Sequence, residues 1–314
     1  MRRTAFAAAL CLLGFGAAAF AQQRAALDAL KAYPGTAEKA PFVLRSQVAE
    51  VAVQLAVTDR SGKLVPELTP DDLQVLDNGI PAAITELHRE DELPLRVALV
   101  IDWSDSLQKD LEFERKVALD FLRTVLRPDV DRAMEVGFRY RVEVTQPLTG
   151  DIRSLEAGLR PVAGAPLSSV YDALVAAADG LRHADPYLPQ RRAIVLLSDG
   201  EDNASAHGLL DAIKAAQRAN VTIYTIAPRR RRARSAGDEV LMELAMVTGG
   251  RAFFISRSAE QPAFETIRRD LRTGYALYFK PGPGDGHRLR SLEIKARDQN
   301  LQVQARHSYY PGWE

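Results

Sequence analysis

The sequence contains a single cysteine, Cys11, among its 314 residues, which excludes both a disulfide framework and a cysteine-rich zinc site. It also lacks an excess of charge of either sign, because 41 Lys and Arg residues balance 41 Asp and Glu residues. We therefore expect no nucleic-acid partner, since nucleic-acid-binding proteins carry a basic excess. With 46% hydrophobic residues the chain is neither disordered nor collagen-like, and its length is typical of two domains.

Only the N-terminus carries a long uncharged apolar run. Residues 1–3 are basic at two positions, residues 4–21 carry no charge, and the run ends in Ala-Phe-Ala. This order is typical of a signal peptide, so we predict export to the periplasm or medium, with cleavage after Ala21. An uncleaved membrane anchor is the alternative, although such a run is short for a span. Cleavage would remove two arginines and Cys11, leaving a mature chain without thiols or a transmembrane segment.

Two segments rich in short strands flank the centre of the chain. Residues 43–92 alternate apolar and polar residues and contain Asp-Asn-Gly at 77–79, which predicts a hairpin whose returning strand covers 83–88. Residues 274–310 also contain short strands joined by turns. Neither segment has enough strands to be stable alone, so we expect the two to form one β-sandwich. Residues 22–42, polar and Ala-rich, are interpreted as a linker.

The central segment, residues 94–273, alternates strands with amphipathic helices. Its strands at 96–101, 193–197 and 221–226 are nearly continuous apolar runs, which are typical of strands buried on both faces of a sheet. This pattern predicts an α/β domain with a doubly wound, mostly parallel, Rossmann-like sheet.

Polar residues follow two of these strands where each ends. Asp102, Ser104 and Ser106 come after the first strand, Asp199 comes after the second, and Ser168 precedes a helix between them. Ligands bind at the carboxyl ends of the strands in such sheets. If the loops converge, their oxygen atoms form a site suited to Mg²⁺ or Mn²⁺. Helix capping is the alternative for the first group, but it leaves the other two residues unexplained.

These residues resemble the metal-ion-dependent adhesion site of the von Willebrand factor type A (VWFA) domain, and the resemblance covers residues 94–273. The family has Asp-x-Ser-x-Ser, then a Thr from a middle loop, then Asp-Gly. The sequence matches at 102–106 and 199–200, and Ser168 replaces the Thr. Asp105 stands where the family most often has Gly, which adds negative charge. The resemblance implies a divalent cation that accepts a carboxylate from a partner protein or peptide.

The flanking segments carry a narrower resemblance. Val-Thr-Asp-Arg-Ser-Gly at 57–62, Leu-Asp-Asn-Gly at 76–79 and Tyr-Tyr-Pro at 309–311 are similar to exported bacterial proteins with a VWFA-related domain, common in Acidobacteria. We therefore expect a non-enzymatic protein-binding or adhesion module, with the sandwich as a spacer or docking module. Asp172 and Asp202 are the candidates for supporting the metal ligands.

Two alternative functions remain open at this point. One is a metal-independent interaction protein with a degenerate site, which binds through surface loops such as 228–237. A run of arginines in that loop indicates either an anionic partner or a solvated loop: Arg229, Arg230, Arg231 and Arg232. The other is a metal-dependent hydrolase, which is disfavoured because no general base is spaced near Asp102 and no G-x-S-x-G motif occurs.

Overall fold

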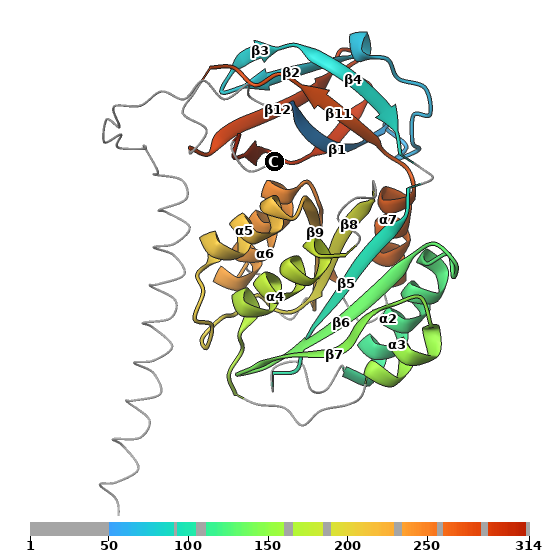
Figure 1. Ribbon diagram of the computed structural model, residues 1–314, viewed down its shortest axis with the longest axis vertical. Coiled ribbons are helices and arrows are strands. Elements are labelled where there is room, and N and C mark those ends of the chain that lie inside the picture. Colours follow the sequence, from blue (N-terminus) through green and yellow to red (C-terminus); the bar gives the residue numbers. More distant parts are fainter. Residues whose placement is uncertain are drawn as a thin grey trace, which may run out of the picture.

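The computed structural model (Figure 1) describes most of the chain after residue 49. The described ranges are 50–90, 93–104, 111–159, 166–184, 190–228, 234–255, 260–283 and 288–311. The expected signal peptide and linker, Ser106 and the arginine run at 229–232 lie outside them. Within these ranges, no helix is both long enough and apolar enough to cross a membrane.

A six-stranded sheet forms the centre of the α/β domain, in the order β10-β9-β8-β5-β6-β7. All neighbouring strands are parallel except β6 and β7, which form an antiparallel edge. Every residue of β5 is buried, as predicted for a strand covered on both faces. The strands are β5 (Leu95–Asp102), β6 (Arg132–Phe138), β7 (Val142–Thr149), β8 (Arg191–Leu197), β9 (Val221–Pro228) and β10 (Ala252–Ile255).

Helices cover both faces of this sheet (Figure 1). One face packs against α4 (Val170–Arg182), α5 (Leu209–Arg218) and α6 (Ala236–Thr248). The other packs against α2 (Leu111–Val125), α3 (Ile152–Gly158) and α7 (Glu260–Arg272). The sequence reasoning missed the short helix α3. Asp151 caps it, because its carboxylate accepts hydrogen bonds from the backbone N–H groups of Arg153 and Ser154.

Strands from both ends of the chain build two further sheets, each antiparallel (Figure 1). The first has the order β13-β1-β11-β4 and the second β14-β12-β2-β3. They share one core, in which Val53, Leu277 and Leu292 are buried. This confirms the predicted fold class, an α/β domain flanked by a β-sandwich. The strands are β1 (Val51–Thr58), β2 (Leu73–Asp77), β3 (Ile80–Ala82), β4 (Ile84–Arg89), β11 (Tyr275–Phe279), β12 (Arg290–Ala296), β13 (Gln302–Ala305) and β14 (Ser308–Tyr309).

The hairpin at 77–79 differs from the prediction in its returning strand. Asn78 and Gly79 have positive φ angles, as a tight hairpin requires, but the strand paired with β2 is β3. The residues predicted as the returning strand belong to β4, which crosses to the other sheet and pairs with β11. This crossing allows Ile84 and Leu87 to pack against the shared core, so tertiary packing outweighs the local hairpin pattern.

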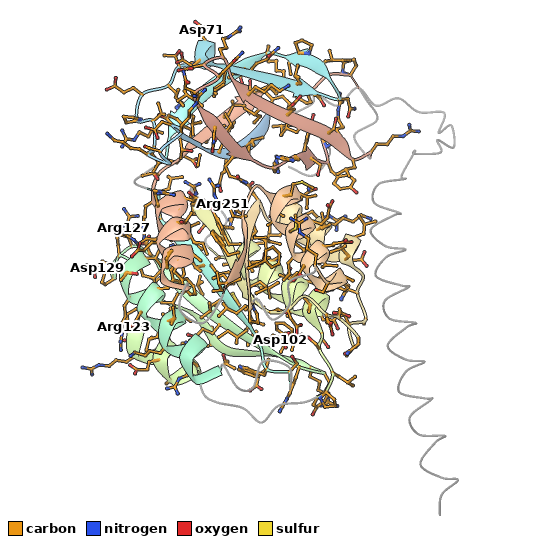
Figure 2. The ribbon with its side chains drawn as sticks, turned by 180° about the vertical axis from the view of Figure 1, so that it is seen from behind. Asp71, Asp102, Arg123, Arg127, Asp129 and Arg251 are labelled. Atoms are coloured by element: carbon orange, nitrogen blue, oxygen red, sulfur yellow. The ribbon has the colours of Figure 1, made fainter. Side chains whose placement is uncertain are left out.

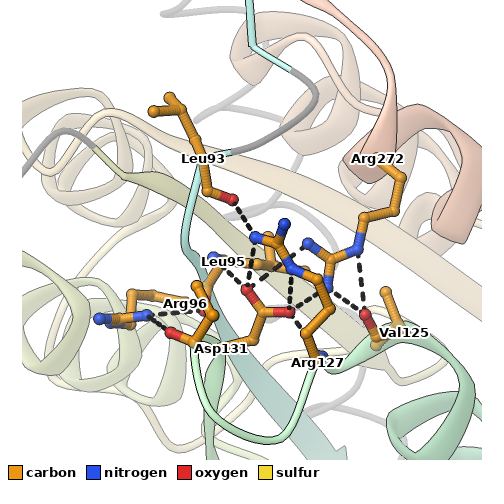
Figure 3. Close-up of polar contacts among 8 residues, drawn as sticks. Leu93, Leu95, Arg96, Val125, Arg127, Asp131 and Arg272 are labelled. Carbon is orange, nitrogen blue, oxygen red and sulfur yellow. Dashed lines mark hydrogen bonds and ion pairs between the residues drawn. The ribbon is translucent and has the colours of Figure 1, made fainter.

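A buried carboxylate holds together the points where the chain enters and leaves the α/β domain (Figure 3). Asp131 accepts hydrogen bonds from the backbone N–H of Leu95, 2.8 Å away at the start of β5, and from Arg127, whose N–H lies 2.6 Å away. The guanidinium groups of Arg127, whose Nε lies 3.2 Å away, and of Arg272, at the end of α7, also donate to it. Burial acts to raise the pKa of Asp131, but the hydrogen bonds from both arginines outweigh burial and lower it.

Candidate functional site

Asp102, the first of the predicted metal ligands, lies at the end of the α/β domain that faces away from the sandwich (Figure 2). Asp102 is the last residue of β5, and Ser198 follows the last residue of β8, its parallel neighbour. The polar side chains of the site are buried: Asp102 is fully buried, and Ser104 and Ser168 are 6% and 4% exposed. Buried polar groups require hydrogen-bond partners, and the local network provides them.

The neighbouring backbone and two segments distant in sequence converge on the Asp102 carboxylate. Its Oδ1 accepts a hydrogen bond from the backbone N–H of Ser104, at 2.9 Å. Its Oδ2 accepts hydrogen bonds from the hydroxyls of Ser168, at 3.2 Å, and Ser198, at 2.8 Å. The predicted convergence of Asp102, Ser104 and Ser168 is therefore observed, and Ser198 joins them.

Burial disfavours the charged form of this carboxylate. Desolvation raises the pKa of Asp102 to about 6, although hydrogen bonds from Ser104 and Ser198 act in the opposite direction. The negative charge of Asp199 raises the pKa further. A cation between the two carboxylates would reverse this effect, because opposite charge stabilises the ionised form. In the described ranges no three His, Cys, Asp or Glu side chains gather at one point. A cation here would therefore also need the serine hydroxyls.

Asn203 fixes the position of Ser168 and was missed by the sequence reasoning. Its side-chain oxygen accepts a 2.8 Å hydrogen bond from the backbone N–H of Ser168. In return, the backbone N–H groups of Asn203 and Ala204 donate to the carbonyl oxygen of Ser168. No motif in the sequence identifies Asn203. Ser198 could have been identified from its position, because it lies directly before Asp199 at the end of a buried strand.

Asp172 and Asp202, the expected supporting residues, attach the loop at 202–207 to the start of α4. Asp202 accepts a hydrogen bond from the backbone N–H of Tyr171, at 3.1 Å. Asp172 accepts one from the backbone N–H of His207 and contacts its ring Nδ1 at 2.8 Å. Both residues thus position the helix that follows Ser168.

Asp199 lies at the rim of the site, partly exposed, and accepts a 3.3 Å hydrogen bond from the backbone N–H of Glu201. The loop that carries it lies against α6, and two glycines allow this close approach. Gly200 has a φ of +78°, and a Cβ on it would lie 2.5 Å from the carbonyl oxygen of Gly237. The Asp-Gly pair therefore has a local steric reason.

Trp103 packs behind the site rather than forming part of its surface. It is 5% exposed, and its ring lies over Gly137, where a Cβ would come within 1.9 Å of a ring carbon. Its backbone N–H donates a 2.8 Å hydrogen bond to the carbonyl oxygen of Phe138. This packing fixes the backbone between Asp102 and Ser104.

Similar folds occur in proteins from bacteria and from a mussel. BatB from Bacteroides thetaiotaomicron is 18% identical and covers 56% of this chain and 98% of its own, with a TM-score of 0.46. The vWF domain of the type V pili tip protein Mfa5 from Porphyromonas gingivalis is 13% identical. The match covers 56% of this chain and 94% of the Mfa5 chain, with a TM-score of 0.46. Proximal thread matrix protein 1 (PTMP1) from the mussel byssus, whose metal-ion-dependent adhesion site (MIDAS) motif is occupied by zinc, is 15% identical. The match covers 62% of this chain and 49% of the PTMP1 chain, with a TM-score of 0.48.

A comparison with curated proteins found no significant match. The family model described as the von Willebrand factor type A domain matches residues 97–269, which is more than half of the chain and spans the sheet and its helices from β5 to α7. The chain therefore belongs to the von Willebrand factor type A domain family.

Proposed function

We propose that this protein is an exported, non-enzymatic interaction module that binds a divalent cation, Mg²⁺ or Mn²⁺, and through it a carboxylate of a partner protein. The observation that carries this proposal is the buried carboxylate of Asp102, on which two hydroxyls and a backbone N–H converge. The cation would be held by Asp102, Ser104, Ser106, Ser168 and Asp199.

The chemistry of the donors supports this choice of cation. All five side chains offer oxygen, which Mg²⁺ and Mn²⁺ prefer over the nitrogen and sulfur ligands of softer metals. When bound, the cation would balance the negative charges of the buried Asp102 and the nearby Asp199. A partner carboxylate could then complete its coordination.

The place of the site in the molecule supports an interaction role. Asp102 and the sandwich lie at opposite ends (Figure 2), so a partner could approach the site without meeting the sandwich. We propose that residues 94–273 form the α/β interaction domain and that residues 43–92 and 274–310 form the sandwich, which acts as a spacer or docking module. Export rests on the signal-peptide pattern of residues 1–21.

A metal-independent interaction module is the second candidate, and one observation favours it. Ser168 and Ser198 already donate hydrogen bonds to Oδ2 of Asp102. Burial raises the pKa of this carboxyl to about 6, so in slightly acidic solution it is neutral and has no charge for a cation to balance. This network of hydrogen bonds would hold the loops in place without a cation.

Thermal unfolding with and without cation separates the two candidates. Mg²⁺ or Mn²⁺ at about 100 times its Kd should stabilise the folded protein by about 2.7 kcal/mol. Asp102→Asn, which keeps the shape but removes the charge, should abolish this gain. Asp71→Asn is the matched control, because Asp71 is exposed in the sandwich far from the site (Figure 2).

If neither cation raises the Tm of the wild-type protein, the metal-dependent proposal is refuted and the metal-independent candidate is favoured. A second readout is capture of partners from the native envelope or medium, with Mg²⁺ or with chelator. Metal-dependent binding predicts that chelator and Asp102→Asn release the same proteins.

A further inference from the structure

A groove of about 680 Å³ opens along α4, on the face of the sheet opposite α2 and α7. It lies between α4, α5 and the turn that joins β6 to β7. We call it the basic groove. It is lined by Tyr140, Arg141, Val142, Asp172, Val175, Ala176, Ala178, Asp179, Arg182, His207, Ala215 and Arg218.

One end of the basic groove lies beside the candidate site. Phe138, the last residue of β6, is the register partner of Asp102, so the turn that contains Tyr140 stands at the same end of the sheet. Asp172, in the first turn of α4, lies only four residues after Ser168. From Asp172 to Arg182, the groove follows α4 for about 15 Å.

The rim of the groove is basic and aromatic. Tyr140 is 47% exposed, and the guanidinium carbons of Arg139 and Arg141 each lie 5.5 Å from the centre of its ring. Arg182 and Arg218, both exposed, end α4 and α5 at the other end of the groove. Guanidinium groups thus occur at both ends, and each is suited to bidentate binding of a carboxylate.

Two carboxylates, Asp172 and Asp179, also line the groove. Asp172 lies 2.8 Å from Nδ1 of His207 and accepts backbone N–H groups, and Asp179 lies 3.5 Å from Nδ1 of His183. Arg182 makes no ion pair with any residue in the described part of the chain. The lining thus holds three arginines, Arg141, Arg182 and Arg218, against two carboxylates, which leaves one positive charge in excess.

The middle of the groove is apolar, with Val142, Val175 and Ala178 among its lining residues. Nucleic acid and acidic polysaccharide have no aliphatic side chains to cover such a surface. A small anion would need donors that converge on one point, whereas these arginines come from three elements around an apolar centre. Tyr and Arg are also among the residues that are enriched at the energetic hot spots of protein interfaces.

We propose that the basic groove binds an extended, acidic segment of a partner protein, with carboxylates near its two ends and apolar side chains between them. A stretch of about five extended residues spans 15 Å. This inference goes beyond the cation-dependent site, because none of its contacts needs a metal.

Selection from a display library of random short peptides tests this inference. The full chain is immobilised in the presence of chelator, so that no cation-dependent binding contributes. We expect the selected peptides to be enriched in pairs of Asp or Glu separated by apolar residues. An absence of acidic enrichment would overturn the proposal, as would acidic peptides without apolar residues, because those would indicate a site for any polyanion.

The most enriched peptide, labelled with a fluorophore, is then titrated against variants by anisotropy. Arg141→Glu with Arg182→Glu should raise the Kd about tenfold or more, and Tyr140→Ala should raise it severalfold. The matched control is Arg268→Glu with Arg269→Glu, which makes the same change in charge at a separate groove on α7. It should change the Kd less than about twofold.

Milder substitutions guard against loss of folding. Arg141→Gln with Arg182→Gln should raise the Kd in the same direction while the Tm stays within the range of the control. Equal affinity of wild-type and groove variants would place the peptide elsewhere and refute the proposal. The peptide is titrated in chelator, whereas the metal site is tested by the cation-dependent rise in Tm, so a failure of the metal site and a failure of the groove give different results.

Discussion

The hydroxyl of Ser198 lies 2.8 Å from Oδ2 of Asp102 and donates a hydrogen bond to it. This bond joins the carboxyl ends of two neighbouring parallel strands, β5 and β8. Since Ser168 donates to the same oxygen from the start of α4, the orientation of the carboxylate depends on two hydroxyls supplied by other segments.

Substitution of Ser198 therefore tests how the carboxylate is oriented. Ser198→Ala should weaken Mg²⁺ or Mn²⁺ binding about tenfold, because residues that orient metal ligands contribute on this scale. Titration calorimetry with each cation measures the effect. Ser61→Ala, an exposed hydroxyl in the sandwich that bonds to Asp59, is the control. Unchanged cation affinity in Ser198→Ala would show that this hydrogen bond does not position the ligand.

Gly137 leaves room for the ring of Trp103 directly behind the site. Gly137→Ala should destabilise the protein by about 1–3 kcal/mol, since the new methyl group overlaps the ring and forces it to move. Chemical denaturation measures the loss, and a change in tryptophan fluorescence reports the displaced ring. Gly208→Ala is the control for steric space, because the nearest atom to its Cβ would be 3.7 Å away. Since Gly208 is the N-cap of α5, this variant should lose less than about 1 kcal/mol and leave tryptophan fluorescence unchanged. A variant as stable as wild type contradicts the tight packing.

Glu135 is a buried carboxyl on β6 that is 1% exposed, with no hydrogen bond to either oxygen within the described part of the chain. Burial raises its pKa from 4.5 to about 8. Between these values the unfolded chain releases the proton while the folded protein keeps it. The free energy of unfolding should therefore fall as the pH rises, by up to about 1.4 kcal/mol per pH unit from this group.

Glu135→Gln removes this pH dependence. The variant should match the wild type near pH 4 and exceed it in stability at pH 8, as measured by urea denaturation at each pH. Glu143→Gln, an exposed carboxyl on the neighbouring strand, is the control and should follow the wild-type curve. If Glu135→Gln keeps the same slope between pH 5 and pH 8, the carboxyl is ionised in the folded protein.

Asp131 should contribute strongly to stability, because it neutralises Arg272 and satisfies the backbone of β5. Asp131→Ala should cost about 3 kcal/mol at neutral pH, the scale for breaking a buried ion pair. The pKa of this carboxyl is lowered by its hydrogen bonds, so its contribution is complete above the ordinary value of 3.8. It is lost as the pH falls below that value.

The difference between wild type and Asp131→Ala should accordingly shrink in acid. Denaturation curves at pH 7 and pH 2.5 measure it. Asp120→Ala removes an exposed carboxylate 3.6 Å from Arg123 and should cost less than about 1 kcal/mol at either pH. A cost for Asp131→Ala that is independent of pH would mean that the lost packing, not the charge, dominates.

Much of the fold follows from local sequence patterns. The apolar runs at 96–101, 193–197 and 221–226 correspond to β5, β8 and β9, because a strand buried on both faces needs apolar residues throughout. The turn at 77–79 correctly predicts that β2 begins a hairpin, but the same pattern places β4 in the wrong sheet. Local alternation describes a strand without stating which partner it has.

Local sequence patterns are enough to predict the family, the alternation of strands and helices, and the positions of Asp102 and Asp199 after buried strands. These features depend on residues close together along the chain. The hydrogen bond from Ser198 to Asp102, the attachment of Ser168 by Asn203 and the basic groove along α4 emerge only in the folded chain. Each of these depends on the order of strands in the sheet and on helix packing, which bring together residues that no local pattern connects.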